Sequence, residues 1–456
     1  MEPIEVAEAL QSYFDYLDAH REPFLEELKA YLRQPSVAAQ NLGTREMAAL
    51  ARQRLEARGF KVQIIPTRGQ PVVFGELGAG PKTLLIYNHY DVQPPEPLDL
   101  WETPAFEPAV RAGKLYARGV ADNKGDQMCR MQAIEAWLAT LGPLPFKIKW
   151  VIEGEEEIGS VHLEEFAREH AALLQADGCL WETGGYNELD QFTLTLGLKG
   201  IAYFELRVNL MQTDAHSAYG AILPNAAWRL VWALSTLKAP DNQITLDGYQ
   251  EQVVPPSAAD IDLVDRLPFD GTAIRQIYGA REFLNGMDDR AASRAMAYQP
   301  TLTICGFDSG YTGEGAKTVL PRQARAKLDF RLVPRLTPEL VQDLLRQHLD
   351  RRGFTDIEVV RLAGEHYARS SPEAPVVKAA IAAARKVHGY DPVIYPVAGG
   401  SGPMYPLSDM LGIPAVLAGM AYEECKAHAP NENIRLEDYW RQQRFIGEFF
   451  QEFAAA

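Results

Sequence analysis

The sequence predicts an α/β fold with a mostly parallel sheet, interrupted by a smaller α+β domain. Short β-rich runs alternate with helical segments between residues 61 and 181, a pattern typical of parallel strands joined by helices. From residue 198 the strands become longer and alternate in polarity, and from residue 370 the first pattern returns. The expected organisation is one domain made of residues 1–197 and 370–456, with residues 198–369 inserted as a second domain.

Each element follows from a local pattern of apolar and turn-forming residues. In the first domain we expect helices at residues 4–16, 23–33, 45–58, 125–141, 162–174, 373–387 and 436–453, and strands at residues 61–65, 71–74, 83–87, 146–152, 178–181, 393–395 and 415–417. In the inserted domain we expect strands at residues 200–209, 299–304, 324–332 and 355–362, and helices at residues 225–237 and 338–351.

The composition indicates a globular chain that does not act on nucleic acid. There are 45 Lys and Arg residues against 61 Asp and Glu residues, a formal net charge of −16, whereas phosphate binding requires clustered cations. The longest apolar runs fall short of the ~20 residues that span a bilayer, and the first residues lack the pattern of a secretory signal. Four scattered cysteines without a CxxC pair predict buried thiols in a reducing compartment. We therefore expect a cytoplasmic protein without a membrane partner.

Polar side chains follow several of the predicted strands at the point where each strand ends. In open parallel sheets that edge is where ligands bind. The side chains concerned are His89, Asp91, Asp122, Glu156, Glu157 and Glu182, and a late imidazole, His428, could join them. Two imidazoles with several carboxylates suit Zn²⁺, Mn²⁺ or Co²⁺. Taken singly, each of these residues could equally be a surface acid, a helix cap or a loop histidine, so the spacing alone leaves both interpretations open.

The motifs themselves are more specific, and they resemble those of the co-catalytic dinuclear metallopeptidases. This family includes carnosinase, cytosolic nonspecific dipeptidase, glutamate carboxypeptidase and acyl-amino-acid deacylases, and the resemblance extends from about residue 23 to the last helix. The motifs of the first domain are His89-x-Asp91-Val-x-Pro, Gly119-Val-Ala-Asp122-Asn-Lys-Gly125 and Glu153-Gly-Glu-Glu156-Glu157-Ile-Gly159-Ser160. Those of the later chain are Thr213-Asp-Ala-His216-Ser217, Lys317-Thr-Val-Leu-Pro321, Asp329-Phe-Arg331-Leu-Val-Pro334 and Gly399-Gly-Ser401.

The resemblance implies a phosphorylase/hydrolase-like catalytic domain and a ferredoxin-like lid or dimerisation domain. It also implies two divalent metal ions per subunit, Zn²⁺ first among them. By this resemblance Asp122 bridges the ions, His89 and Glu182 complete one site, Glu157 and His428 complete the other, Glu156 is the general base, and Asp91 orients His89. The resemblance further implies a cis peptide bond between Asp122 and Asn123, and a homodimer in which His216 reaches the site of the other subunit and stabilises the oxyanion.

A substrate carboxylate also has candidate partners in the sequence. Arg331 can bind it through two parallel hydrogen bonds, and the turn at Gly400 and Ser401 can offer backbone N–H groups and a hydroxyl. The expected function is therefore metal-dependent hydrolysis of dipeptides or short peptides with a free C-terminal carboxylate, through a metal-bridging water activated by Glu156.

Two departures from the dipeptidase pattern leave alternatives open. Dipeptidases of the family usually have Asp where this chain has Glu182, and an acidic residue where it has Ala398. The alternatives are an N-acyl-amino-acid amidohydrolase, a glutamate-carboxypeptidase-like enzyme and, more remotely, a non-catalytic metal-binding protein.

Overall fold

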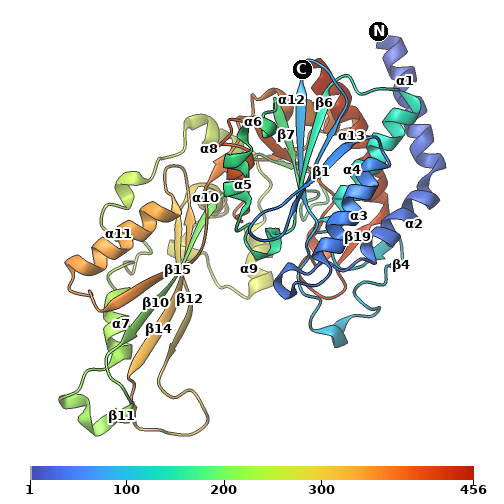
Figure 1. Ribbon diagram of the computed structural model, residues 1–456. Coiled ribbons are helices and arrows are strands. Elements are labelled where there is room, and N and C mark those ends of the chain that lie inside the picture. The colour runs from blue at the N-terminus through green and yellow to red at the C-terminus, as the bar shows by residue number, and fades with distance from the viewer. Residues whose placement is uncertain (1–2) are drawn as a thin grey trace. The chain divides into compact units, whose positions relative to one another are not determined.

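A computed structural model describes the backbone of residues 3–456 and the side chains from residue 10 onward. The chain forms two compact units, each with its own sheet (Figure 1). Among the described residues, the first unit contains residues 3–197, Arg369–Pro396 and Pro403–Ala456, and the second unit contains Leu198–Ala368 and Val397–Gly402. Within residues 3–456 no helix is long and apolar enough to cross a membrane.

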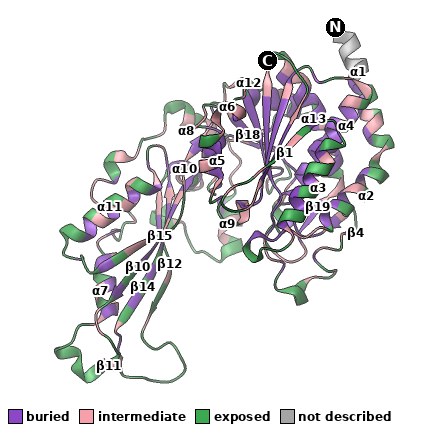
Figure 2. Cartoon of the chain, in the orientation of Figure 1, coloured by how far each residue is buried: buried purple, intermediate pink, exposed green. Residues whose placement is uncertain are grey.

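The first unit is built on an eight-stranded mixed sheet, which confirms the predicted α/β class. Its strand order is β1 (Lys61–Ile65), β2 (Val72–Leu77), β6 (Lys147–Glu153), β3 (Thr83–His89), β7 (Gly178–Trp181), β18 (Ala415–Leu417), β8 (Thr193–Thr195) and β17 (Val393–Tyr395). The consecutive strands β6, β3, β7 and β18 are mutually parallel, whereas β1, β2 and β6 pair antiparallel. Figure 2 shows that these strands are largely buried, which explains why most of them are continuous apolar runs.

Helices enclose this sheet. They are α1 (Pro3–Ala19), α2 (Arg21–Leu32), α3 (Thr44–Glu56), α4 (Lys124–Thr140), α5 (Leu163–Glu169), α6 (Ala171–Leu174), α12 (Pro375–His388) and α13 (Leu436–Ala455). A separate small sheet has the order β19 (Asn433–Arg435), β5 (Lys114–Tyr116) and β4 (Ala109–Arg111). Three short strands here, β4, β5 and β19, have no counterpart in the sequence prediction.

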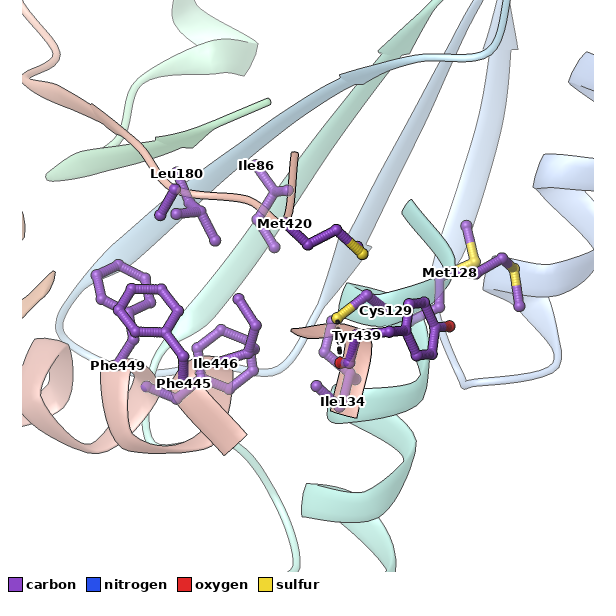
Figure 3. Close-up of a cluster of buried hydrophobic side chains, with 14 of the residues drawn as sticks. Ile86, Met128, Cys129, Ile134, Leu180, Met420, Tyr439, Phe445, Ile446 and Phe449 are labelled. Carbon is purple, nitrogen blue, oxygen red and sulfur yellow. Dashed lines mark hydrogen bonds between the residues drawn. The ribbon is translucent and has the colours of Figure 1, made fainter. Parts of the chain in front are cut away.

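The core of the first unit fixes helix α4. Figure 3 shows Met128, Cys129 and Ile134 of α4 in the same apolar cluster as Tyr439 and Phe445 of α13. All of these side chains are fully buried, and burying an aliphatic or aromatic side chain stabilises a fold by about 1.5–3 kcal/mol. Because Asp122 immediately precedes α4, this packing also holds the end of the loop that carries it. The peptide bond between Asp122 and Asn123 is cis, as the resemblance predicts.

The second unit contains a four-stranded antiparallel sheet with two helices on one face, a ferredoxin-like arrangement as predicted. The spatial order is β12 (Thr301–Ser309), β14 (Gln323–Leu332), β10 (Gly200–Asn209) and β15 (Ile357–Glu365). Helices α7 (Ala226–Leu234) and α11 (Pro338–Arg351) pack against this sheet. Phe204, Leu328 and Phe330 form the core beneath them. Four further short strands are β9 (Gly197–Leu198), β11 (Ala215–His216), β13 (Val319–Leu320) and β16 (Ala368–Arg369).

Two features of the second unit differ from the sequence prediction. Helices α8 (Ala258–Asp265), α9 (Gly271–Tyr278) and α10 (Asp289–Tyr298) occupy a stretch for which no element was predicted. They are short, and few of their residues are buried, so each offers only a few core positions for a sequence pattern. Cys305 is also exposed on the edge strand β12, whereas the other three cysteines are buried. The prediction that all four thiols are buried was therefore wrong for Cys305.

Candidate active site

Three neighbouring parallel strands deliver polar residues to one edge of the sheet. His89 is the last residue of β3, Glu182 directly follows β7, and Glu156 and Glu157 lie in the turn after β6. Because β6, β3 and β7 are adjacent and parallel, their carboxyl ends meet at the same edge. The loop before α4 adds Asp122, and the loop after β18 adds His428.

Asp122 lies between the two imidazoles. Its Oδ1 is 3.0 Å from Nε2 of His89, and its Oδ2 is 3.0 Å from Nε2 of His428. Nε2 of His428 is also 3.2 Å from Oε2 of Glu157, and Nε2 of His89 is 3.4 Å from Oε2 of Glu182. The structure thus brings together all five residues that the resemblance names as metal ligands.

Asp91 supports this cluster from behind. Its carboxylate accepts hydrogen bonds from the backbone N–H groups of Glu156 and Glu157, at 3.2 and 3.0 Å. Its Oδ1 lies 3.4 Å from Nδ1 of His89, and its carbonyl oxygen lies 3.0 Å from the same nitrogen. Asp91 is completely buried. It therefore ties the turn of Glu156 to the ring of His89.

The pKa values of these groups are shifted by burial and by a local excess of negative charge. Burial raises the pKa of Glu156 and of Glu182 well above the ordinary value, and neighbouring carboxylates add to the effect, while His89 opposes it. Burial alone would lower the pKa of His89, but Glu182, Asp122 and Asp91 outweigh it and hold that pKa well above its ordinary value. The hydrogen bonds that His428 donates to the carboxylates of Asp122 and Glu157 raise its pKa to about 10.

These observations fit a pair of bound divalent ions. His89 with Glu156 and Glu157, and Asp122 with Glu157 and His428, form two groups whose ligand atoms lie within 4.8 Å of one another. Within the described part of the chain, the buried Oε2 of Glu182 accepts no hydrogen bond and lies 3.4 Å from Nε2 of His89, and a carboxylate oxygen in this state is costly unless a cation compensates it fully. Imidazole and carboxylate donors are those that borderline divalent ions prefer.

Two supporting residues escaped the sequence analysis. Glu432 accepts hydrogen bonds from Arg118 and from the backbone N–H groups of Gly119, Ala121 and Asp122, at 2.8 to 3.1 Å. It thus fixes the loop that carries Asp122. Gln93 donates to Oε2 of Glu157 at 2.7 Å. Gln93 is a variable position inside the His89-x-Asp91-Val-x-Pro motif, and Glu432 lies four residues after His428, and these positions were the only sequence signal for them.

The candidate carboxylate-binding residues lie together in the second unit. Arg331, on β14, donates from Nη1 to Oγ of Ser401 at 2.9 Å, and its Nε is 3.3 Å from Oδ2 of Asp329. The carbonyl of Gly400 accepts from the backbone N–H of Lys199 at 3.1 Å. The turn is thereby held beside the guanidinium.

His216 lies apart from this pair within the second unit. It belongs to the short strand β11, which pairs with β13 just before β14 begins, whereas Arg331 is near the other end of β14. At about 3.3 Å per residue, the length of β14 separates the two by roughly 30 Å. The ring of His216 accepts from Ala218 N at 3.1 Å and lies 3.4 Å from Oγ1 of Thr318. Figure 2 shows the surrounding segment as exposed.

Comparisons with known proteins agree with this geometry. Residues 85–452 match the family model described as Peptidase family M20/M25/M40. A beta-Ala-His dipeptidase from Rattus norvegicus is 27% identical, over 97% of this chain and 95% of that protein. A Cys-Gly metallodipeptidase from Schizosaccharomyces pombe is 26% identical, over 98% of this chain and 99% of that protein.

A solved structure is also similar over most of its length. The M20 family metallo-carboxypeptidase Sso-CP2 from Sulfolobus solfataricus has a TM-score of 0.90 and 35% identity, and the match covers 95% of this chain and 99% of that one. The resemblance that the motifs indicated is confirmed, and the chain belongs to the peptidase family M20/M25/M40 as a metallopeptidase.

Proposed function

We propose that this chain is a dinuclear metal-dependent hydrolase that cleaves the amide bond preceding a C-terminal residue in dipeptides and short peptides. One observation carries the proposal: His89, Asp122, Glu157, Glu182 and His428 form one cluster, and the half-buried acid Glu156 lies beside His89 and Glu157 in it. The names of the beta-Ala-His and Cys-Gly dipeptidase relatives support the dipeptide substrate.

Five residues would hold the two metal ions. Asp122 would be shared by both, His89 and Glu182 would complete one site, and Glu157 and His428 would complete the other. When bound, the ions polarise the scissile carbonyl and lower the pKa of water toward neutrality. We favour Zn²⁺, with Mn²⁺ and Co²⁺ as alternatives, because the donors are imidazoles and carboxylates.

Glu156 is the proposed general base. It takes a proton from the attacking water and returns it to the leaving nitrogen. The two hydrogen bonds that Asp91 accepts from this turn fix the backbone of Glu156. Glu156 and Glu182 share an acidic neighbourhood, so the base retains a raised proton affinity, which suits a group that both accepts and donates a proton.

Arg331 and Ser401 are the proposed anchors for the substrate carboxylate, with the backbone of Gly400 beside them. The hydrogen bond from Arg331 to Ser401 and the contact with Asp329 hold the guanidinium in one orientation. A free C-terminal carboxylate is therefore expected to be required, and its amide is expected to lower binding.

We propose a homodimer in which His216 of one copy serves the site of the other. Roughly 30 Å separates His216 from Arg331 within one copy, so a substrate bound by Arg331 needs His216 from elsewhere. The second unit also presents surfaces suited to pairing. Trp228 and Trp232 on α7 are 56% and 54% exposed and stack at 6.0 Å, and Ile304 lies on the edge strand β12.

Beside these surfaces lies a cavity of about 260 Å³. Its lining is Leu234, Leu237, Lys238, Leu302, Thr303, Ile304 and Leu328. An exposed apolar face next to an edge strand is typical of an interface. We propose that a second copy covers α7 and β12.

The first experiment tests turnover and the base together. The protein is reconstituted with Zn²⁺ or Mn²⁺ and given Ala-Leu or N-acetyl-Leu, which share the carboxylate but differ in the free amine. E156Q is expected to retain metal and lose turnover. The matched control is E164Q, which makes the same change at a half-buried acid on α5. Unchanged turnover in E156Q would refute the role of Glu156.

The choice of substrate separates the two closest functions. Faster cleavage of Ala-Leu places the enzyme among dipeptidases, whereas faster cleavage of N-acetyl-Leu indicates an amidohydrolase. The absence of an acidic side chain at Ala398 favours the second outcome, and the names of the dipeptidase relatives favour the first. Because the similar structure from Sulfolobus solfataricus is a metallo-carboxypeptidase, longer peptides are tested as a third class of substrate beside Ala-Leu and N-acetyl-Leu.

A mixing experiment tests the exchanged histidine. H216A and E156Q are each expected to be inactive as homodimers. In a mixed dimer, the H216A copy has intact metal ligands and base, and it receives His216 from the E156Q copy. Activity that appears only after mixing supports the proposal, and inactivity of verified mixed dimers contradicts it.

We also propose that the protein works in the cytoplasm. All four cysteines are free thiols, which is typical of a reducing compartment.

A further inference from the structure

One row of residues crosses the sheet of the second unit beside the carboxylate anchor. Thr301 on β12 pairs with Arg331 on β14, Arg331 pairs with Ile201 on β10, and Ile201 pairs with Glu365 on β15. Directly paired residues of antiparallel strands project to the same face. Arg331 and Glu365 therefore point from the same face, with one strand between them.

That face is the one without helices. Gly364, the neighbour of Glu365, pairs with the buried Ala202, and a side chain at Gly364 would contact Pro338 of helix α11. Successive residues of a strand alternate between faces. Glu365 is thus directed away from the helices and toward the side of Arg331.

One oxygen of the Glu365 carboxylate is buried without a hydrogen-bond donor. Its Oε2 is buried and has no hydrogen-bond partner within the part of the chain that the structure describes. Arg331, the nearest cation on this face, is instead hydrogen-bonded to Ser401 and paired with Asp329. Burial raises the pKa of Glu365 to about 7, although the charge of Arg331 lowers it. A carboxylate oxygen without a partner is costly in such a place, so Glu365 is poised for a ligand.

The charges around Arg331 indicate which ligand fits. Arg331 and the buried Lys199 are the two cations of this region. Lys199 donates a hydrogen bond to the carbonyl of Gln299, which leaves Arg331 to bind an anion. Glu365 is an anion on the same face, about two strand spacings or roughly 10 Å from Arg331 between Cα atoms. Two extended residues span about 7 Å, a length of the same order as this separation. A molecule with an anion at one end and a cation at the other matches this spacing.

We propose that Glu365 binds a positively charged group of the substrate whose carboxylate is bound by Arg331. The inference rests on the proposed function, because it takes Arg331 as the carboxylate anchor. Two parts of a peptide can carry the cation: the free α-amine, or a basic side chain on the C-terminal residue. Either would give Glu365 the charge-assisted hydrogen bond that it lacks.

Four substrates distinguish the two carriers. Ala-Lys has both cations, Ala-norleucine has only the amine, N-acetyl-Ala-Lys has only the side-chain cation, and N-acetyl-Ala-norleucine has neither. They are compared on the wild type, on E365Q and on the control E358Q. Glu358 is an exposed acid on the same strand and the same face, paired with Arg207 at 3.8 Å and distant from Arg331.

The expected result is a preference that depends on Glu365. In the wild type, kcat/KM is expected to be roughly 10- to 100-fold higher with the relevant cation than without it, mainly through KM, as for a hydrogen bond to a charged group. E365Q should abolish that preference and leave the substrate without a cation unaffected, and E358Q should behave as the wild type. Melting temperatures verify that E365Q folds.

The outcomes separate this inference from the proposed function. If E365Q cleaves all four substrates in the wild-type ratios, or slows all four equally, the inference is overturned while the hydrolase remains. If the wild type cleaves none of the four substrates, the proposed function fails. The role of Glu365 is then tested separately, by measuring the calorimetric binding of Ala-Lys and N-acetyl-Ala-norleucine to the wild type and to E365Q. Tighter binding of Ala-Lys that disappears in E365Q supports the role of Glu365, and equal binding refutes it.

Discussion

Replacing Glu432 by Gln is expected to destabilise the first unit and to weaken its metal site. The Glu432 carboxylate is completely buried and accepts four hydrogen bonds, three of them from the backbone of the loop that ends at Asp122. Its fourth donor, Arg118, is 1% exposed. In E432Q the charge is lost, and the amide nitrogen faces N–H groups that also donate.

The magnitude follows from the burial of the pair. Removing one partner of a buried ion pair costs about 3–5 kcal/mol, because the other charge is left uncompensated. A domain of this size loses about 2 °C of melting temperature per kcal/mol, so we expect a drop of roughly 6–10 °C. R118M leaves Glu432 with three backbone donors and is expected to cost less, about 1.5–3 kcal/mol.

Calorimetric melting of the wild type, E432Q, R118M and the double variant tests this reasoning. The metal-free proteins are compared first, so that stability is read without bound ions. The double variant should cost less than the sum of the single variants by about 0.5–3 kcal/mol. Metal affinity, titrated next, should fall about 10- to 100-fold in E432Q. Melting of E432Q within 2 °C of the wild type would refute the reasoning, as would strict additivity.

Three further predictions concern the metal site and the core. D91N should weaken metal binding about 10- to 100-fold in a calorimetric titration, because the amide keeps one acceptor oxygen but turns an NH2 donor toward a backbone N–H of the turn or toward the ring of His89; unchanged affinity would contradict this role. Chelation should abolish activity and lower the melting temperature, and Zn²⁺ or Mn²⁺ at 100 times its Kd should restore about 2.7 kcal/mol; a melting temperature insensitive to both would count against a metal centre. His388 stacks on Phe192 at 4.3 Å, and burial lowers its pKa to about 4. The unfolded chain therefore binds the extra proton between pH 6.5 and pH 4, and stability falls by up to about 3 kcal/mol across that window. About 2 kcal/mol of this loss occurs between pH 7 and pH 4.5, so in H388F the acid sensitivity measured by urea melts at these two pH values should shrink by that smaller amount, and equal losses in both proteins would show the prediction to be wrong.

The sequence predicted the parts of the fold that rest on local pattern. The strands β3, β6 and β7 were expected within a residue or two, because they are apolar runs bounded by turn residues. Strand β8 was missed because it is short and its partners β17 and β18 lie far along the chain. Helices α8 to α10 were missed because they are short and bury few residues. Local periodicity carries no information on such contacts.

Some residues of the candidate site could likewise be named from the sequence, and others could not. Residues inside ordered motifs, such as His89 and Asp122, could be named because their spacing follows the strands. Glu432, Lys199 and Glu365 could not, because their importance lies in burial and in partners that only the folded chain supplies. A lone Glu in a sequence is usually a solvated surface residue.

The position of β18 has a consequence for synthesis on the ribosome. This strand lies between β7 and β8, although the whole second unit, Val397–Gly402 included, is translated before it. The sheet of the second unit can therefore form while the central sheet still lacks an inner strand. Until β18 emerges, β7 and β8 have backbone groups without their native partner, an arrangement prone to mispairing. Synthesis of the first unit begins before that of the second unit and ends after it. We therefore expect the first unit of a nascent chain to depend on chaperones for longer than the second unit does.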